Sequence, residues 1–252
     1  MGRRLAFFFR RRGFRVLIHD PAGALRGFAP AGLDAARDAD VVVVAASLER
    51  TAAALEAVLD RKPRGLVLDI ASVKAPLLPA IGRARAEGVA IASVHPMFGP
   101  EVRSFRGSDL IVCDCGDAAA ARRAKALFAG AGLKIRTIPL AEHDPWNAKT
   151  LGLAHFVALA AAGALAELGV DLDGVDGRAS TSFRHLLTLV EPILDQEPAL
   201  TRAIQASNPQ SDLVAGHLAE QVEAFRRLLF EKDLTALTSR LVACRRALRP
   251  RS

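Results

Sequence analysis

The segment GLVLDIASVK at residues 65–74 and the segment VAIASVHPMFGP at residues 89–100 decide the fold of this chain. Each begins with a short apolar run and ends in polar residues, which is typical of a strand buried on both faces of a parallel sheet. Residues 76–87 lie between them and are long enough for the helical crossover that two parallel strands need. Ligands of open α/β sheets bind at the carboxyl ends of the strands, so these two strand ends predict a functional site.

The alternation of apolar runs and amphipathic segments continues on both sides of this pair. Strands that alternate with helices of about 10–15 residues specify a mainly parallel, doubly wound sheet. We therefore expect a Rossmann-like α/β fold for the first part of the chain. The strands are predicted at residues 14–18, 41–45, 65–69, 89–94, 109–113 and 134–138, and the helices at residues 4–12, 48–60, 76–87 and 118–131.

The pattern changes after Leu140, beyond which no strand-like run follows. Asp144-Pro145 predicts a helix start, with Asp144 as the N-cap and Pro145 in the first turn. We divide the chain into a dinucleotide-binding domain at residues 1–140 and an all-helical substrate-binding and dimerisation domain at residues 141–252. The helices of this second domain are predicted at residues 145–169, 176–196, 199–206, 211–231 and 233–248.

The composition excludes several classes of protein. The 252 residues are 51% hydrophobic, which is enough for a substantial core and argues against disorder. The net charge of +7 comes largely from arginines near the two ends, without interleaved aromatics and with no tyrosine, so nucleic-acid binding is not expected. The three cysteines form neither a zinc framework nor a secreted disulfide set, so we expect a reducing cytoplasm and no metal.

One segment has the length of a membrane span. Residues 151–170 are almost wholly apolar and are interrupted only by His155 and Glu167. Their alanine and glycine content makes them weakly hydrophobic, so we expect a buried helix of a soluble bundle and no membrane association. The arginine-rich start lacks a small-residue cleavage site, so no signal peptide is expected.

The amino end is similar to the second half of a dinucleotide-binding βαβ unit. A helix, Gly13 and a strand ending at Asp20 follow Met1-Gly2 directly, whereas the full fingerprint has a strand and a G-x-G-x-x-G turn before the helix. Asp20 lies 18 residues after Gly2, close to the place of the ribose-binding acid if Gly2 is the last glycine of that turn. Alternatively, Gly2 merely follows the initiator methionine. We expect a start codon assigned too late, with the missing strand encoded upstream.

Several short motifs follow one another along the chain. In order, they are DIASVK at 69–74, HPMFGP at 95–100, EHD at 142–144 and HF at 155–156, with TSFR at 181–184 and QEP at 196–198 in the helical half. Together these motifs resemble the prephenate dehydrogenase family. The resemblance implies NAD-dependent oxidative decarboxylation of prephenate, of arogenate or of a related cyclohexadienol, which yields the 4-hydroxyphenyl product in tyrosine biosynthesis. It also implies a homodimer formed through the helical domain.

The resemblance implies that His95 is the catalytic base. A neutral imidazole suits this task, because its ordinary pKa of about 6.5 leaves it largely unprotonated at neutral pH. A strand-end histidine that hydrogen-bonds the backbone is the alternative. Ser72, at the end of the neighbouring strand, corresponds to a family serine that contacts the substrate hydroxyl and the catalytic histidine. Ser72 could equally cap the next helix, and both roles are compatible.

Four further residues are candidates for substrate binding through the resemblance. Lys74 holds a substrate carboxylate or a cofactor phosphate, or is simply solvated. Glu101 matches a gating acid of part of the family, or is an exposed loop residue. His155 matches a substrate-proximal histidine, or packs in a core. Arg184 matches a family arginine and is the candidate for binding a carboxylate of the dicarboxylate substrate.

The chain departs from the family pattern at one position. Six residues before Pro198, many members have the arginine that binds the substrate carboxylate, and this chain has Pro192 there, after Glu191. A proline beside an acid provides no positive charge. This difference leaves room for a modified substrate, for a compensating arginine, or for lost activity. The absent first strand supports the alternative of a degenerate, non-catalytic dimeric protein that has lost cofactor binding.

The cofactor assignment depends on the strand ends of the first domain. Asp20 favours NAD over NADP, because a carboxylate accepts the ribose hydroxyl bonds and repels a 2′-phosphate, although Arg26 nearby argues the other way. Ser47 and Thr51 flank the loop after the strand at residues 41–45, where the cofactor lies in the family. Helix capping explains these two residues as well. His143, beside the predicted cap, is interpreted as part of a helix start.

Overall fold

The computed structural model describes residues 1–99, 101–175, 177–231 and 233–249. Pro100, the last residue of the HPMFGP motif, lies outside these ranges. The chain divides into two compact units, which are described separately below. The first comprises Met1–Asn147 and Gln196–Pro209, and the second comprises Ala148–Asp195 and Gln210–Ser252.

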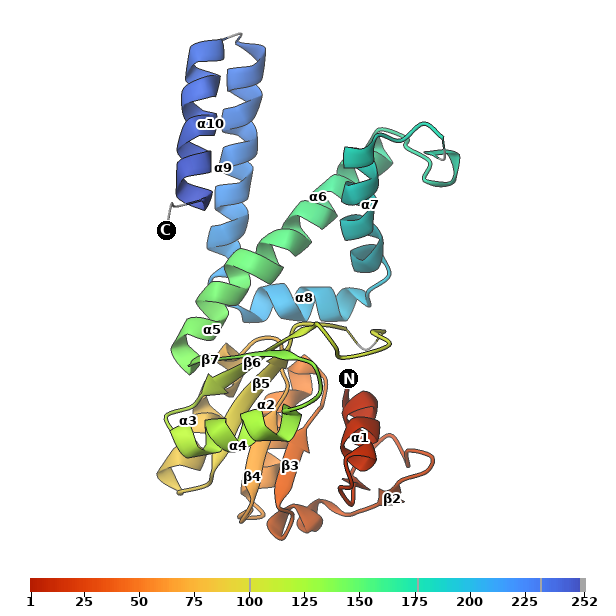
Figure 1. The fold of residues 1–252 in the computed structure, drawn as a ribbon, viewed down its shortest axis with the longest axis vertical. Coiled ribbons are helices and arrows are strands. Elements are labelled where there is room, and N and C mark those ends of the chain that lie inside the picture. The colour runs from red at the N-terminus through yellow and green to blue at the C-terminus, as the bar shows by residue number, and fades with distance from the viewer. Residues whose placement is uncertain (100, 176, 232, 250–252) are drawn as a thin grey trace. The chain divides into compact units, whose positions relative to one another are not determined.

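The first unit is built on a five-stranded sheet with the order β3-β4-β5-β6-β7 (Figure 1). All neighbouring strands are parallel except β5 and β6, so the prediction of a mainly parallel Rossmann-like sheet is confirmed. The strands are β3 (Val41–Val44), β4 (Leu66–Asp69), β5 (Ile91–Pro96), β6 (Asp109–Asp114) and β7 (Lys134–Pro139), and the helices between them are α2 (Leu48–Leu59), α3 (Leu78–Ala86) and α4 (Ala118–Phe128).

The amino end adds a helix and a short separate sheet. Helix α1 (Gly2–Arg11) precedes strand β1 (Leu17–Ile18), which pairs in parallel with β2 (Ala29–Pro30). The sequence predicts this helix, but the buried strand predicted at residues 14–18 is only partly confirmed, because just Leu17–Ile18 is a strand, and it is not buried and lies outside the five-stranded sheet. Strand β2 has no apolar run that would reveal it. A short 3-10 helix, Leu33–Arg37, leads from this pair to β3.

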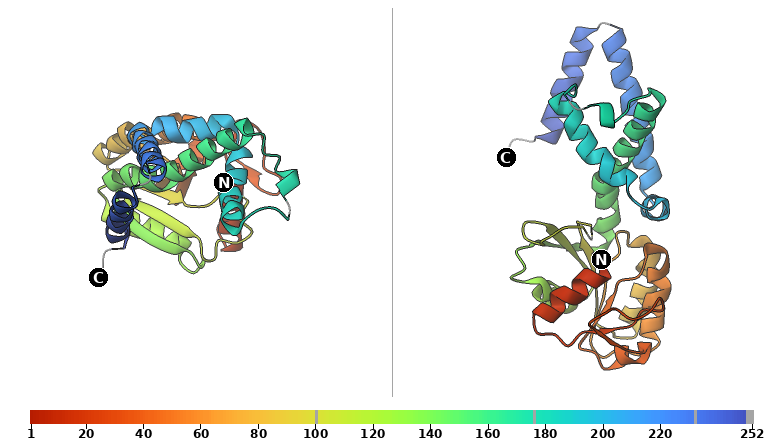
Figure 2. Two further views of the ribbon diagram at one scale, coloured as in Figure 1. Left: turned by 90° about the horizontal axis from the view of Figure 1, so that it is seen from above. Right: turned by 90° about the vertical axis from the view of Figure 1, so that its right-hand side faces the viewer.

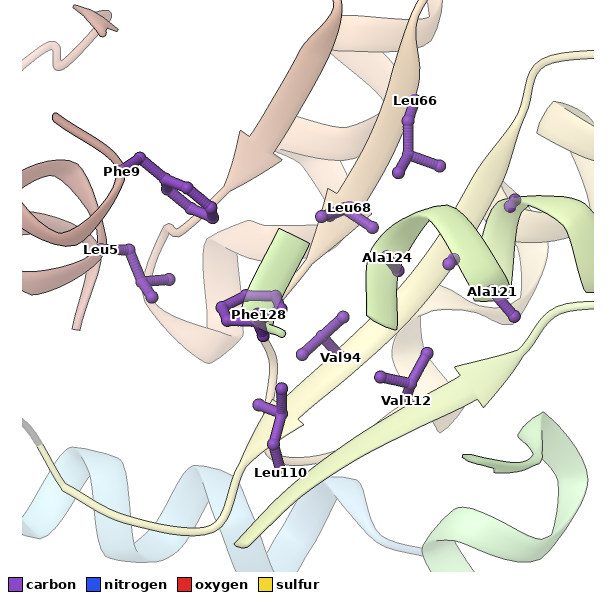
Figure 3. Close-up of a cluster of buried hydrophobic side chains, with 12 residues drawn as sticks. Leu5, Phe9, Leu66, Leu68, Val94, Leu110, Val112, Ala121, Ala124 and Phe128 are labelled. Carbon is purple, nitrogen blue, oxygen red and sulfur yellow. The ribbon is translucent and has the colours of Figure 1, made fainter. Parts of the chain in front are cut away.

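The core of the first unit lies between the sheet and two helices (Figure 3). Side chains of α1 and α4 pack against the apolar side chains of the strands. Burial of each large side chain contributes about 1.5–3 kcal/mol, so this cluster anchors α1 to the sheet. The labelled members are Leu5, Phe9, Leu66, Leu68, Val94, Leu110, Val112, Ala121, Ala124 and Phe128.

The second unit is helical throughout its described part. A π-helical turn, Ala148–Gly152, leads into α6 (Leu153–Glu167), which packs against α7 (Thr181–Leu194) through a small core around Ala158, Val190 and Ile193. Helices α9 (Ser211–Phe230) and α10 (Leu234–Leu248) lie side by side as a hairpin (Figures 1 and 2). A Rossmann-like domain followed by a helical domain is the predicted fold class.

Two helices differ from the prediction. Helix α5 (Leu140–Asn147) begins before Asp144 and has Pro145 in its interior, so the predicted start at Asp144 is wrong. The carboxylate of Asp144 does not cap its own helix, because backbone N–H groups of Lys74 and Ala75 donate to it. Helix α8 (Pro198–Ser207) belongs to the first unit, where it contacts α2.

One helical stretch in the described part of the chain, Leu140–Glu167, has the length and composition of a membrane span. Only 17% of its most apolar window is buried within the chain. In α6, His155 and Ala158 are the buried residues. Most apolar side chains of this helix therefore remain uncovered within one chain.

Candidate active site

The candidate site forms where β4 and β5 end, as expected for an open α/β sheet. Asp69 of β4 pairs with Ser93 of β5, and His95 lies two residues further along β5. All residues of β5 are buried, and the exposed fraction of His95 is 4%. The site histidine therefore projects from a strand held on both sides by β4 and β6, which fixes its position.

A chain of hydrogen bonds connects His95 to an acid. His95 Nδ1 lies 3.0 Å from His143 Nε2, and His143 Nδ1 lies 2.7 Å from Asp144 Oδ1. His143 and Asp144 both come from α5, and His143 is fully buried. The sequence interpretation of His143 as part of a helix start is thus wrong, because His143 lies within α5 and its ring is hydrogen-bonded to the ring of His95.

Asp144 is held as a carboxylate. Its oxygens accept hydrogen bonds from the backbone N–H of Lys74, at 2.9 and 3.1 Å, and from that of Ala75, at 2.7 Å. Burial alone would raise the pKa of Asp144, but the hydrogen bonds from His143, Lys74 and Ala75 outweigh it and lower the pKa. The side chain thus closes the backbone turn after β4 and carries a negative charge to His143.

Both histidines are neutral near pH 7. Burial, assisted by the positive charge of Lys74 and by His143, holds the pKa of His95 well below its ordinary value of 6.5. Burial also lowers the pKa of His143, against the hydrogen bond to Asp144, which raises it. A neutral imidazole is the form of His95 that accepts a proton.

Lys74 is a structural residue in this arrangement. Its exposed fraction is 1%, and its ammonium donates to Asp69 Oδ1 at 2.9 Å, to the carbonyl of Ala71 at 2.6 Å and to the carbonyl of Val94 at 2.9 Å. An ammonium has three hydrogens, and these three acceptors occupy all of them. This geometry argues against the predicted role of Lys74 in binding a substrate carboxylate, and makes it a link between β4 and β5.

The loops beside the strand ends contain Ser72 and Glu101. Ser72 is half-buried after β4, and its carbonyl accepts a hydrogen bond from Asn147 Nδ2 at 2.9 Å, which ties the loop to α5. Glu101 is exposed, and its carboxylate folds back over Gly99. The roles of Ser72 at the substrate hydroxyl and of Glu101 as a gating acid stay predictions.

Two of the cofactor candidates, Gly2 and Ser47, lie at the start of α1 and in the loop after β3. A Cβ at Gly2 would lie 2.9 Å from the Cβ of Ala45, so the start of α1 packs directly on the chain after β3. The loop at that point contains Ser47, which is exposed at the N-cap of α2. A helix amino terminus beside a strand end is where a pyrophosphate binds in dinucleotide sites, so these residues fit such a cofactor.

The other two cofactor candidates have local partners. Asp20 is exposed after β1, and its Oδ1 accepts the backbone N–H of Ala22 at 2.9 Å, which leaves the second carboxylate oxygen for a ribose hydroxyl. Thr51 is buried, and its hydroxyl donates to the carbonyl of Ser47 at 2.8 Å. For Thr51, stabilisation of the first turn of α2 is therefore the better interpretation.

The remaining predicted site residues belong to the second unit. His155 is 4% exposed on α6, its Nδ1 has no hydrogen-bond partner among the described residues, and burial lowers its pKa. Arg184 is exposed in the first turn of α7. Pro192 lies inside α7 near its end, so the position where many family members have an arginine is helical here but uncharged.

Sequence reasoning missed the contribution of Asp144 and His143 to the site. The EHD motif was visible, but the Asp-Pro pair that follows suggested a cap. Within the described ranges, no group of three or more His, Cys, Asp or Glu residues has the arrangement of a metal site.

The fold and the site define the class of this protein, which is a Rossmann-like nucleotide-binding domain followed by a helical domain. A family model described as the nucleotide-binding domain of prephenate dehydrogenase matches residues 23–136, and one described as its dimerization domain matches residues 139–242. Together they cover most of the chain, which belongs to the prephenate dehydrogenase family.

Two relatives are similar in sequence over most of this chain. A probable arogenate/prephenate dehydrogenase of Methanocaldococcus jannaschii is 26% identical over 205 residues, which are 80% of this chain and 46% of the relative. The T-protein of Enterobacter agglomerans is 28% identical over 163 residues, which are 65% of this chain and 43% of the relative. The chain thus spans less than half the length of these two relatives.

Solved structures share the fold. Synechocystis arogenate dehydrogenase superposes with a TM-score of 0.72 at 19% identity and covers 97% of this chain and 94% of its own. Prephenate dehydrogenase from Aquifex aeolicus, in complex with hydroxyphenyl propionate and NAD+, has a TM-score of 0.65 at 18% identity, covering 81% and 74%. At these identities the comparison supports the arrangement of the elements.

Proposed function

We propose that this chain catalyses the NAD-dependent oxidative decarboxylation of prephenate, of arogenate or of a closely related cyclohexadienol. The observation that carries the proposal is the neutral, buried imidazole of His95 at the end of β5, supported from behind by His143 and Asp144. Membership of the prephenate dehydrogenase family supports the reaction class.

The residues of the first unit would hold the cofactor and the base. Gly2 and the loop with Ser47 would receive the pyrophosphate, and Asp20 the ribose, where its carboxylate favours NAD over NADP. When bound, NAD supplies the hydride acceptor. His95 takes the proton of the substrate hydroxyl, and the loss of carbon dioxide makes the ring aromatic, which drives the reaction.

Binding of a dicarboxylate substrate needs positive charge. In the second unit Arg184 and His155 are the candidates for substrate binding that the resemblance to the family indicates. Pro192 lies in α7 where many family members have an arginine, so one contact to a substrate carboxylate is missing. We therefore expect prephenate to bind less tightly than a related substrate that needs one carboxylate contact fewer.

The helical unit supports a homodimer. Leu234, Leu241 and Leu248 recur at seven-residue spacing on α10 and are 74%, 41% and 82% exposed. Apolar residues at this spacing form the seam of paired helices, and the matching family model is described as a dimerization domain. Three free thiols, two of them buried, support a cytoplasmic enzyme.

The test is turnover by the purified chain and by its His95→Asn variant. We expect NADH formation from NAD with prephenate or arogenate, and a loss of at least about 100-fold in kcat for His95→Asn with little change in NAD affinity. His185→Asn, an exposed histidine of α7, is the matched control and should keep full activity. Normal turnover by His95→Asn would refute the assignment of the base.

A second candidate function is favoured by Pro192, the uncharged position in α7. On this alternative the chain is a dimeric binding protein of the family without catalysis or cofactor binding. Calorimetry of NAD binding to the purified chain separates the two candidates. Binding at micromolar concentration supports the dehydrogenase, and no detectable heat supports the non-catalytic alternative.

A further inference from the structure

Three groups at the site form a linear array that the assignment of His95 alone does not explain. His143 is fully buried between His95 and Asp144, and no exposed surface of the ring is left for a ligand. Burial of a polar ring is costly unless both nitrogens are hydrogen-bonded, and here both are. A second buried histidine in contact with the base therefore needs a role within the chain.

The hydrogen bonds assign the tautomers of both rings. Asp144 is a carboxylate and accepts only, so His143 Nδ1 carries the proton of the 2.7 Å bond. In a neutral ring the other nitrogen is an acceptor, so His95 Nδ1 donates to His143 Nε2 across 3.0 Å. The lone pair of His95 is then on Nε2. Within the described part of the chain, no protein group hydrogen-bonds that atom.

The surrounding charges make the two rings unequal. The ammonium of Lys74 donates to the carbonyl of Val94, the residue before His95, and its charge opposes an imidazolium at His95. The same charge also lowers the pKa of His143, but there the hydrogen bond to Asp144 has the larger, opposite effect. The carboxylate of Asp144 touches His143 directly and favours an imidazolium there. Asp69, the partner of Lys74, is the other acid of this cluster. When a proton binds His95, the positive charge is therefore more stable on the ring of His143.

We propose that His143 and Asp144 are positioning and proton-accepting partners of His95, which keep the lone pair on His95 Nε2 and take over the proton that this atom receives. The proposal deepens the proposed function, on which it rests for the source of the proton. The substrate hydroxyl proton binds His95 Nε2, and the proton on His95 Nδ1 passes to His143 Nε2. The result is a neutral His95 and an imidazolium at His143, paired with Asp144.

Nitrogen-15 NMR of the histidine rings in the wild-type chain without ligands tests the proposal without any turnover. At pH 8 we expect His95 protonated on Nδ1 and unprotonated on Nε2, which is the opposite of the tautomer that free histidine prefers. On acidification we expect His143 to become charged first, while His95 stays neutral and changes to the Nε2-protonated form. A His95 protonated on Nε2 at pH 8, or charged before His143, would overturn the proposal.

Two substitutions of His143 separate its two tasks in the reaction. In His143→Gln the side-chain oxygen still accepts from His95 Nδ1 but takes no proton, and we expect kcat to fall about 10-fold with KM unchanged. In His143→Leu both tasks are lost, and we expect a fall of about 100-fold. His185→Gln on α7 is the control, with unchanged kcat.

The outcomes distinguish this proposal from the proposed function. Full turnover by His143→Gln or by His143→Leu would overturn the proposed role of His143 as the proton-accepting partner of His95. If the wild-type chain oxidises neither prephenate nor arogenate, the proposed function fails. The nitrogen-15 spectra of the wild-type chain still test whether His143 accepts a proton from His95.

Discussion

The two units of this chain differ in how completely they bury their apolar side chains. In the first unit Leu66, Leu68 and Val112 are completely buried, and even charged groups such as Lys74 and Asp69 lie inside. In the second unit no described residue of α10 is buried, and Phe230 at the end of α9 is 77% exposed. One unit completes its core within the chain, and the other leaves long apolar helices uncovered.

This difference indicates where each unit obtains its stability. In the first unit the hydrophobic core encloses a polar network, and such a network is stable only if every buried charge has a partner. The second unit exposes apolar side chains, and in the homodimer proposed above a second copy of the chain would cover them.

The largest effect is expected for Lys74→Met in the first unit. Removal of the ammonium leaves the carboxylate of Asp69 buried without its counter-charge, and breaking a buried pair in this way costs about 3–5 kcal/mol. Urea unfolding of the purified chain measures the loss. Lys125→Met, an exposed lysine of α4, is the control and should change the free energy of unfolding by less than about 0.5 kcal/mol.

A double variant makes this prediction sharper. Lys74→Met with Asp69→Asn removes both charges, so part of the lost stability should return. If the single variant unfolds at the same urea concentration as the wild type, Lys74 is not the internal partner described above, and its predicted role in ligand binding becomes the better interpretation.

The second prediction concerns the uncovered helices. Leu241→Glu places a charge in the apolar row of α10, and we expect the dimer to weaken by about 2 kcal/mol, or about 30-fold in Kd. Sedimentation velocity over a concentration series measures this. Ser239→Glu adds the same charge to α10 outside the row and should leave the dimer intact. Equal dimerisation of both variants would show that another surface covers this unit.

The third prediction is a loss of stability in mild acid. In the folded chain burial lowers the pKa of His95, of His143 and of His155 below the ordinary value of 6.5. As the pH falls below 6.5 the unfolded chain binds protons that the folded chain does not, so the free energy of unfolding decreases there and is retained above pH 6.5. Urea unfolding between pH 8 and pH 5 measures the slope.

His143→Gln serves as the comparison for the acid effect, because it removes one of the two buried histidines of the first unit. Its free energy of unfolding should depend less steeply on pH than that of the wild type. An identical slope would mean that the buried ring of His143 takes up protons as readily when folded as when unfolded.

The smallest effect is expected for Thr51→Val. Loss of the hydroxyl bond to the carbonyl of Ser47 should lower the free energy of unfolding by about 1 kcal/mol, with NAD affinity unchanged. Urea unfolding and NAD calorimetry measure the two quantities. A 10-fold weaker NAD affinity with unchanged stability would restore Thr51 as a cofactor contact.

Most elements of the α/β unit follow from local pattern. The strand predicted at residues 109–113 is observed at Asp109–Asp114, and the helix predicted at residues 48–60 is observed at Leu48–Leu59. Both have continuous or periodic apolar runs, which report burial residue by residue. Strand β2 was missed because Ala29-Pro30 has no such run and pairs only through its neighbour β1.

The sequence alone was enough to predict the alternating architecture and the change to helices after Leu140, and it made His95 the candidate base. Tertiary structure alone decided the partners. Asp144 looks like a helix cap in the sequence, but its carboxylate binds the N–H of Lys74, 70 residues away, and it supports the ring of His143 behind His95. The physical reason is that periodicity and capping are local properties, whereas a buried hydrogen-bond network is chosen by which strand ends and helices the whole fold brings together.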